Sequence, residues 1–319
     1  MIVDILILLA GLALLIFGAE WLVDGSSSIA RRAGLSEFLI GMTIVGIGTS
    51  LPELVVSLTG ALMGSADIAI GNVVGSNIFN VFLILGVTAL IRPVAISDGN
   101  KRRDIPLNIA ACLLLICFGM QHTLFGLGGS DTINAWEGGV FLLLFITYLI
   151  FSIKGGKADD GDGQPETSRK LWFSILMVVV GMAALIFGGD ILVDSACRIA
   201  LNSGLSEKFI AITILAGGTS FPELVTCVVA AAKKKGALAL GNIIGSNISN
   251  ILLILGSSAL ACPLSFANIK PVDLGVLVLS SLALLFSSWT GRNNKIGRGD
   301  ATSFLIVFIA YMAYLILNI

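Results

Sequence analysis

The chain has 319 residues and a formal net charge of −1, and 56% of its residues are hydrophobic while only 12% are charged. Soluble domains carry about a quarter charged residues, so this composition excludes a soluble globular protein, a disordered chain and a nucleic-acid-binding protein with a basic face. Together with a mean hydropathy of +0.99, it predicts an all-α, polytopic membrane protein.

The N-terminal apolar run is predicted to be the first transmembrane helix. It lacks a basic n-region and continues through Val23, which is too long for the h-region of a signal peptide. A spanning helix needs about 20 mostly apolar residues, and ten segments meet this requirement. In chain order they are residues 2–23, 38–63, 68–91, 105–121, 136–153, 171–193, 208–232, 237–262, 271–289 and 302–318. The acids that end the first and sixth spans, among them Asp24 and Asp194, are expected to be solvated or paired with Arg31 and Arg198.

A polar linker is predicted over residues 154–170, between two five-helix halves at residues 1–153 and 171–319. The halves repeat each other at a constant offset of 170 residues. The strongest matches are Gly48-Thr-Ser50 with Gly218-Thr-Ser220, Pro52-Glu-Leu-Val55 with Pro222-Glu-Leu-Val225, and Gly75-Ser-Asn-Ile78 with Gly245-Ser-Asn-Ile248. Because five is an odd number of spans, the second half must be inverted relative to the first. Inverted repeats are a recurring architecture of secondary transporters, which bind their substrates near the bilayer midplane between the repeats.

The distribution of Lys and Arg predicts the orientation of the chain. All but three of the 19 basic residues fall on one side of the ten spans. The exceptions are Arg198, Lys208 and Lys270. By the positive-inside rule, the basic side, with the linker, is cytoplasmic. We therefore expect both termini to face the outside of the cell membrane, whether plasma or inner membrane.

Two acidic residues, Glu53 and Glu223, are predicted to lie deep inside apolar spans. Each follows the start of its span by about fifteen residues, which at ~1.5 Å per residue is close to the middle of the bilayer. A carboxylate there costs several kcal/mol unless it is paired, hydrated or protonated. Apart from Lys208 at the very start of the second span, neither span contains a basic residue, so a proton or a metal cation is the expected partner. A protonated glutamate with a purely structural role is the alternative, which the symmetric positions disfavour.

The residues before each glutamate predict a broken helix. Pro52 and Pro222 cannot donate to the carbonyls four residues earlier, at Gly48 and Gly218. Carbonyl groups freed at membrane depth are tolerated only where they face protein or a wet cavity. A kink that serves packing alone is the alternative. Four hydroxyl groups lie within one turn of the breaks, on Thr49, Ser50, Thr219 and Ser220.

The third and eighth spans carry the second repeated element. The spacing of Gly71 and Gly75, repeated at Gly241 and Gly245, permits close helix approach. Amide and hydroxyl side chains four residues apart share one helical face, which predicts a wall of oxygen atoms opposite Glu53. Hydrogen bonding between helices is the competing interpretation. The residues of this face are Asn72, Ser76 and Asn80, with Asn242, Ser246 and Asn250 as their repeats.

All of these groups are hard oxygen donors. Calcium takes six to eight such oxygen atoms in a flexible site, whereas soft metals prefer thiolate or imidazole. The 5 cysteines lie in or beside apolar runs without a C-x-x-C pair, so we expect buried apolar residues rather than a disulfide framework or a zinc site. The single histidine, His122, is expected to be a loop residue. A histidine-based zinc site or proton relay is therefore excluded.

The G-T-S-x-P-E and G-N-x-x-G-S-N elements of both halves resemble the paired alpha repeats of the cation/calcium exchanger superfamily, specifically the compact prokaryotic sodium/calcium exchangers. The resemblance covers essentially the whole chain. It implies eight tightly packed helices around a four-helix core, across which the first and sixth spans slide. It also implies a secondary active antiporter, not an enzyme, that exchanges calcium for sodium by alternating access in the lipid bilayer. No cofactor, nucleic acid or obligate protein partner is expected.

The same resemblance implies twelve residues that bind the transported calcium and sodium ions. Glu53 and Glu223 would bind calcium with Thr49 and Thr219. The sodium positions would be lined by Ser50, Ser76, Ser220 and Ser246, with backbone oxygen atoms near Gly46 and Ala216. The middle of the site would be completed by Asn80 and Asn250.

Two features depart from the wider superfamily. Some relatives, notably potassium-dependent ones, carry aspartate where Asn250 stands, so potassium coupling is not expected here. The linker at residues 154–170 leaves no room for the calcium-sensing regulatory domain of larger animal exchangers. Two alternative functions stay open: a calcium/proton antiporter in which the two glutamates exchange protons, and a passive cation channel. The hydroxyl groups favour sodium over protons, and inverted halves within one chain favour rocking or sliding over a continuous pore.

Overall fold

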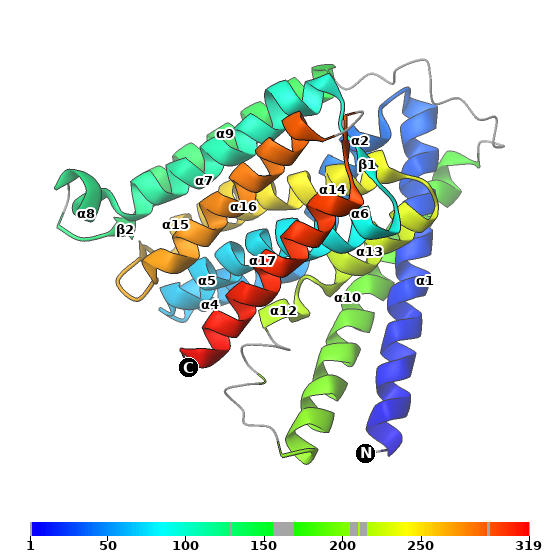
Figure 1. The fold of residues 1–319 in the computed structure, drawn as a ribbon, viewed down its shortest axis with the longest axis horizontal. Helices are drawn as coiled ribbons and strands as arrows, with labels where there is room; N and C mark the ends of the chain where they lie inside the picture. The colour runs from blue at the N-terminus through cyan, green and yellow to red at the C-terminus, as the bar shows by residue number, and fades with distance from the viewer. Residues whose placement is uncertain are drawn as a thin grey trace.

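A computed structural model describes residues 2–127, 129–155, 169–204, 210, 216–291 and 294–318. These residues form a bundle of helices with two short β-ribbons (Figure 1). The predicted linker at 154–170 lies mostly outside the described residues, as does part of the predicted span at 208–232.

The first half contains five helical spans, several of which are interrupted by π-helical turns. They are α1 (Ile2–Ala33), then α2 (Glu37–Ile40) with η1 (Gly41–Val45), α3 (Gly46–Thr49) and α4 (Leu51–Leu62), then α5 (Ala66–Phe79) with η2 (Asn80–Leu85) and α6 (Gly86–Ile91), then η3 (Asn100–Asp104) with α7 (Ile105–Gly119), and α9 (Ala135–Gly155). A short helix, α8 (Gln121–Phe125), follows α7.

The second half follows the same order. Its elements are α10 (Leu171–Asn202), then α12 (Ala216–Gly218) with α13 (Phe221–Ala232), then α14 (Gly236–Ile248) with η5 (Ser249–Leu255) and α15 (Gly256–Ala261), then α16 (Pro271–Thr290) and α17 (Arg298–Leu317).

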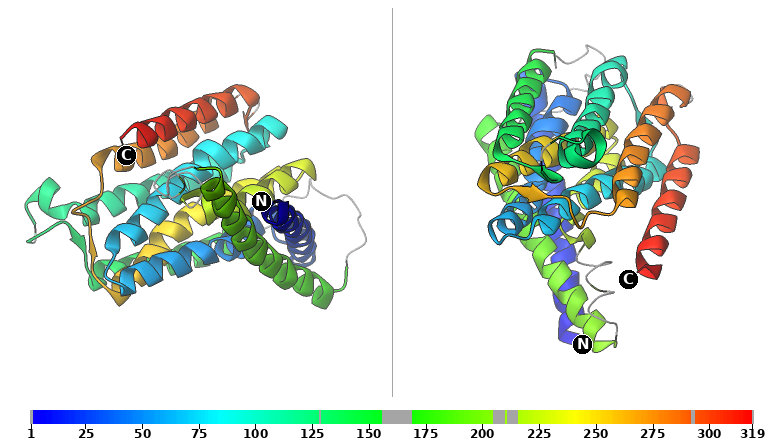
Figure 2. Two further views of the ribbon diagram at one scale, coloured as in Figure 1. Left: turned by 90° about the horizontal axis from the view of Figure 1, so that it is seen from below. Right: turned by 90° about the vertical axis from the view of Figure 1, so that its left-hand side faces the viewer.

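Within the described ranges, 7 helices are long and apolar enough to cross a membrane, and the bent pair Glu37–Thr49 and Leu51–Leu62 makes an eighth. The two remaining predicted spans correspond to the shorter described helices α7 and α13. Both chain ends lie on the same side of the molecule (Figure 1 and Figure 2), as an even number of spans requires. The chain is therefore a multi-pass, mostly helical membrane protein.

Helices α1 and α10 lie against each other at one edge of the bundle and extend beyond it (Figure 1 and Figure 2). They run antiparallel, because Gly11 packs near Gly188 whereas Gly18 packs near Gly181. A Cβ atom added at Gly18 would lie 2.7 Å from the carbonyl oxygen of Gly181, so glycine is needed for this close approach. Each helix has 32 residues and continues well past the predicted ends of its span, at residues 23 and 193. The apolar stretch therefore predicts the helix but not where it ends.

Two β-ribbons tie the halves together. Strand β1 (Val94–Ala95) pairs antiparallel with β4 (Lys295–Ile296), and β2 (Thr132–Ile133) pairs antiparallel with β3 (Leu264–Ser265). Each ribbon takes one strand from each half. Because β1 and β3 are separated by the repeat offset of 170 residues, the two ribbons are equivalent under exchange of the halves. This pairing is the pattern expected of two related, inverted repeats.

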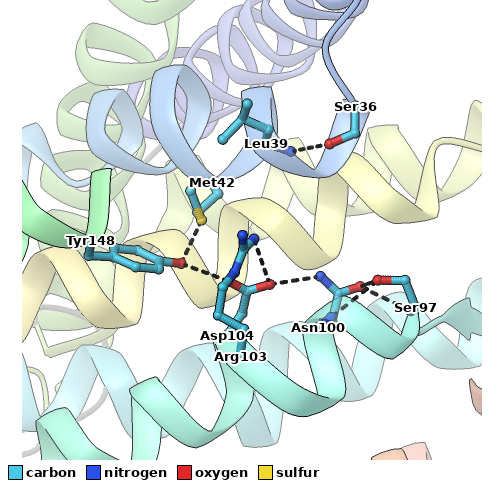
Figure 3. A network of polar contacts seen from close by, with 8 residues as sticks. All are labelled: Ser36, Leu39, Met42, Ser97, Asn100, Arg103, Asp104 and Tyr148. Atoms are coloured by element: carbon cyan, nitrogen blue, oxygen red, sulfur yellow. Dashed lines mark hydrogen bonds and ion pairs between the residues drawn. The ribbon is translucent and has the colours of Figure 1, made fainter. Parts of the chain in front are cut away.

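The ends of the spans hold two further fully buried carboxyl groups, on Asp104 and Glu137. Asp104 is surrounded by hydrogen-bond donors (Figure 3). Its oxygen atoms accept from Arg103 Nε at 2.9 Å, Asn100 Nδ2 at 3.2 Å and the Tyr148 hydroxyl at 3.5 Å. A buried carboxylate with this many donors is stabilised where it stands. Asp104 therefore has a structural role, connecting η3 to α9.

The ion pairs of the acids that end the first and sixth spans differ in part from those expected. Asp24 is ion-paired, but with residues of the second half: Lys233 at 2.9 Å and Lys235 at 3.6 Å. Arg198 pairs with Asp4 at 3.1 Å rather than with the acid at the end of its own span. Sequence alone could not find these pairs, because they join segments between 194 and 211 residues apart.

Candidate cation site

Both helices that carry a central glutamate break at the predicted position. In the first half the axis bends by 45° between α3 and α4. Ser50 at the break has φ −83° and ψ 7°, and its counterpart Ser220 has φ −90° and ψ 4°. Pro52 and Pro222 then occupy the first turns of α4 and α13, where proline needs no hydrogen-bond acceptor. The breaks place each glutamate in the first turn of a new helix.

Each glutamate is hydrogen-bonded by a serine from the opposite half. Ser220 Oγ donates to Glu53 Oε1 at 3.1 Å, and Ser50 Oγ donates to Glu223 Oε1 at 3.3 Å. Ser76 Oγ on α5 lies 3.5 Å from Glu53 Oε1. The predicted wall of α5 therefore does face Glu53, and the two carboxyl groups occupy one shared centre.

Two asparagine pairs join the two halves, within one helical turn of Ser76 and Ser246 along the chain. Asn80 Nδ2 donates to Asn247 Oδ1, and Asn250 Nδ2 donates to Asn77 Oδ1, both at 3.0 Å. Because their amide nitrogen atoms are occupied in this way, Asn80 and Asn250 turn their oxygen atoms elsewhere, and those oxygen atoms have no hydrogen-bond partner. Asn77 and Asn247 were not among the predicted ligands. Asn77 recurs as Asn247 at the repeat offset, and this recurrence was the signal that the sequence offered. It could not show that these two residues fix the amide orientation of Asn80 and Asn250.

The threonines and backbone groups lie at the edge of the same centre. Thr49 Oγ1 donates to Asn242 Oδ1 at 3.1 Å, and Thr219 Oγ1 donates to Asn72 Oδ1 at 3.3 Å. The carbonyl oxygen of Gly46 accepts from Ser246 Oγ at 3.2 Å. Ala216 occupies the matching position at the start of α12.

We call these twelve residues the oxygen cage. Its members are Gly46, Thr49, Ser50, Glu53, Ser76, Asn80, Ala216, Thr219, Ser220, Glu223, Ser246 and Asn250. Its polar side chains are no more than 2% exposed, apart from the half-buried Thr219. Within the described ranges, no group of three or more histidine, cysteine or acidic side chains could hold a metal ion. The oxygen cage must therefore rely on two carboxylates with hydroxyl, amide and carbonyl oxygen atoms.

The other candidate chemistry of the chain does not enter the oxygen cage. All five cysteines are free thiols. Cys112 and Cys227 are buried as expected, whereas Cys117, Cys197 and Cys262 are only half-buried. The predicted close approach is seen in the second half, where a Cβ atom at Gly241 would overlap the carbonyl oxygen of Phe38. At Gly71 and Gly75, no described atom lies within 4 Å of such a Cβ atom.

Comparison with known proteins gives consistent matches along the chain. The family model described as sodium/calcium exchanger protein matches residues 3–154 and 173–317. The chain is 38% identical over 308 residues to an uncharacterised membrane protein of Methanocaldococcus jannaschii, covering 96% of each chain. It is 34% identical over 346 residues to the sodium/calcium exchanger MaX1 of Methanosarcina acetivorans, covering 98% of each.

A solved structure also matches the whole fold. The sodium-calcium exchanger NCX_Mj, soaked with 10 mM Na⁺ and no Ca²⁺, superimposes with a TM-score of 0.84 at 34% sequence identity. The match covers 98% of both chains.

Proposed function

This chain belongs to the sodium/calcium exchanger protein family, and we propose that it exchanges calcium for sodium across the membrane by alternating access at the oxygen cage. Glu53 and Glu223 supply the negative charge of the site. The serine, threonine and asparagine side chains supply neutral oxygen ligands. The chain acts as a transporter and carries out no chemical reaction on its ions.

The observation that carries this proposal is a set of four buried oxygen atoms without a hydrogen-bond partner. They form two pairs at the repeat offset: Oε2 of Glu53 and Glu223, and Oδ1 of Asn80 and Asn250. A buried polar atom without a partner costs about 1–3 kcal/mol, and more when it is charged. A hard cation that is coordinated by all four oxygen atoms removes this cost, because calcium and sodium both bind oxygen ligands.

The charge of the oxygen cage gives a reason for exchange. Two carboxylates neutralise one calcium ion or two sodium ions, so the two loads compete for the same site. An empty oxygen cage carries two uncompensated negative charges, which makes its passage through the dry barrier costly. Only a site that holds its ions can switch from one side of the membrane to the other at low cost. Movement of calcium in one direction is therefore coupled to movement of sodium in the other, which is antiport. A third bound sodium ion would give the loaded site a net positive charge and make the cycle electrogenic.

The two repeated Gly-Asn pairs differ in burial. Gly71 is exposed and Asn72 is half-buried, whereas their counterparts Gly241 and Asn242 are fully buried. Such a difference between equivalent places supports alternating access. The glycine-lined contact between α1 and α10 suits helices that move together, since it leaves few protruding side chains between their backbones.

A calcium/proton antiporter is the second candidate, because the unpaired Oε2 atoms of Glu53 and Glu223 are also good sites for protons. The hydroxyl groups around them favour sodium, since a proton needs no set of oxygen ligands.

We further propose that the protein lies in the cell membrane with both termini outside, on the basis of its basic loops. The ligand assignments of the twelve residues and the division into two five-helix repeats belong to the same proposal.

Calcium flux into proteoliposomes tests the proposed function. Vesicles loaded with sodium are diluted into sodium-free buffer with calcium, and uptake is followed with the pH equal on both sides. We expect uptake that requires the sodium gradient, and none when a proton gradient is applied at equal sodium. Uptake driven by protons alone would establish the proton antiporter, and uptake without any counter-ion gradient would indicate a channel.

A further inference from the structure

Two asparagines outside the oxygen cage hold the hydroxyl groups of two of its members. Asn72 on α5 accepts from Thr219, and Asn242 on α14 accepts from Thr49, at the distances given above. The two contacts are related by the repeat offset. Each joins a core helix of one half to the broken helix of the other half. The arrangement therefore occurs twice in one molecule.

The direction of each amide group is fixed by its nitrogen atom. Asn72 Nδ2 donates to the carbonyl oxygen of Glu53 at 3.2 Å and to Ser57 Oγ at 3.0 Å. Asn242 Nδ2 donates to Cys227 Sγ at 3.3 Å. An amide nitrogen can only donate, so in both halves the amide oxygen must face the threonine. Ser57 and Cys227 stand at equivalent positions, so two different side chains produce the same orientation.

This orientation determines what each threonine can offer to an ion. A hydroxyl group has one proton to donate and two lone pairs to share. If its proton pointed into the oxygen cage, it would repel a cation. For Thr49 the carbonyl oxygen of Gly46 is a second acceptor at 3.5 Å, but Asn242 Oδ1 is nearer at 3.1 Å. A proton held by an amide oxygen outside the oxygen cage leaves the lone pairs free for the ion.

We propose that Asn72 and Asn242 are positioning residues. By accepting the hydroxyl protons of Thr219 and Thr49, they turn the lone pairs of those hydroxyl oxygen atoms toward the bound cation. The proposal rests on the proposed function, because it assumes that the two threonines are ion ligands. It predicts that removing either amide oxygen weakens ion binding without removing any ligand atom.

A double-mutant cycle on Asn242 and Thr49 tests the proposal. Asn242→Leu removes the amide at similar size, and Thr49→Val removes the hydroxyl group. Calcium and sodium dissociation constants of the purified protein are measured by titration, together with melting without ions. We expect each single variant to weaken calcium binding by about tenfold, the worth of one hydrogen bond or ligand contact. The double variant should bind no more weakly than Thr49→Val alone.

Two controls separate positioning from a general loss of packing. Asn108→Leu removes another fully buried amide, which donates to Ser281 at 3.0 Å away from the oxygen cage. It should lower the melting temperature and leave both dissociation constants unchanged. Asn242→Leu combined with Thr219→Val joins residues that share no hydrogen bond, so those two effects should add.

The outcomes distinguish this proposal from the proposed function. If Thr49→Val leaves both ions bound as in the unmodified protein, the assignment of Thr49 as a ligand fails. If Thr49→Val weakens binding but Asn242→Leu does not, or if their effects add, the positioning role is overturned while the site stands. Should Asn242→Leu fail to fold, the cycle of Asn72→Leu with Thr219→Val, at the half-buried contact, gives the same test.

Discussion

Replacing Glu53 with glutamine separates the charge of the oxygen cage from its shape. Glutamine keeps an oxygen atom that can accept from Ser220, which lies 3.1 Å from Oε1. Its amide nitrogen takes the place of Oε2, which has no partner. A bound calcium ion would then leave one uncompensated charge near the bilayer centre, at a cost of about 2.5–3.5 kcal/mol. We expect calcium affinity to fall on the order of a hundredfold.

The folded protein should survive this substitution. A neutral amide is cheaper to bury than a carboxylate, and this gain offsets the unpaired amide nitrogen, which costs about 1–3 kcal/mol. The melting temperature without ions should therefore be unchanged or higher, while the stabilisation by added calcium should be lost. Sodium-driven calcium uptake and melting with and without calcium are measured side by side.

Glu137 provides the matched control for this experiment. It is also a fully buried glutamate with one oxygen atom, Oε1, that has no partner, while its Oε2 accepts from the backbone N–H of Asn134 at 2.6 Å. It differs from Glu53 in its place, at the start of α9 outside the oxygen cage. Glu137→Gln keeps this acceptor and should transport calcium normally. Near-normal uptake by Glu53→Gln would remove Glu53 from the site. Equal losses in both variants would show that any buried carboxyl group matters, and would refute the reasoning from charge.

Three further substitutions probe the oxygen cage, the contact between α1 and α10, and the ion pairs of Asp24. Asn250→Asp adds a third carboxylate and should tighten calcium binding but slow turnover, since the loaded site is no longer neutral; unchanged calcium affinity would place Asn250 outside the oxygen cage. Gly18→Ala should lower stability by about 1–3 kcal/mol and slow exchange because its Cβ atom meets Gly181, whereas Gly139→Ala, which has open space, should do neither. Asp24→Asn removes half-exposed ion pairs with the loop before α14 and should cost at most about 1 kcal/mol, a loss that disappears in melts at high salt.

The sequence predicted the membrane fold and its breaks because the relevant signals are local. Pro52 with the glycines before it marks a break at the position where the axis bends. The repeat offset predicted that Glu53 and Glu223 occupy equivalent places. Hydropathy placed the helix ends less well, because α1 and α10 extend beyond their apolar segments as far as Ala33 and Asn202.

The partners of each side chain could not be predicted in the same way. Ser220 bonds to Glu53 of the other half, 167 residues away, and no pattern within one span indicates that pairing. The predicted face of α5 mixed two kinds of residue that sequence cannot separate: Ser76, which contacts a carboxylate, and Asn72, which contacts a threonine. Likewise Asp104 sits among basic residues at the end of a span, where solvent exposure is the usual outcome, yet it is fully buried.

The same symmetry explains how one chain could open to two sides in turn. Asn72 and Asn242 are identical residues at equivalent places, yet Asn72 is half-buried and Asn242 is fully buried. Exchange of the two conformations between the halves would cover Asn72 and uncover Asn242 while the ligand set stayed the same. The hydrogen bonds that would have to survive this exchange are those between halves, from Ser50 to Glu223 and from Ser220 to Glu53. In the proposed cycle, an ion bound by both glutamates would stabilise the same contacts, so that occupancy of the oxygen cage and movement of the two halves would be coupled through one set of atoms.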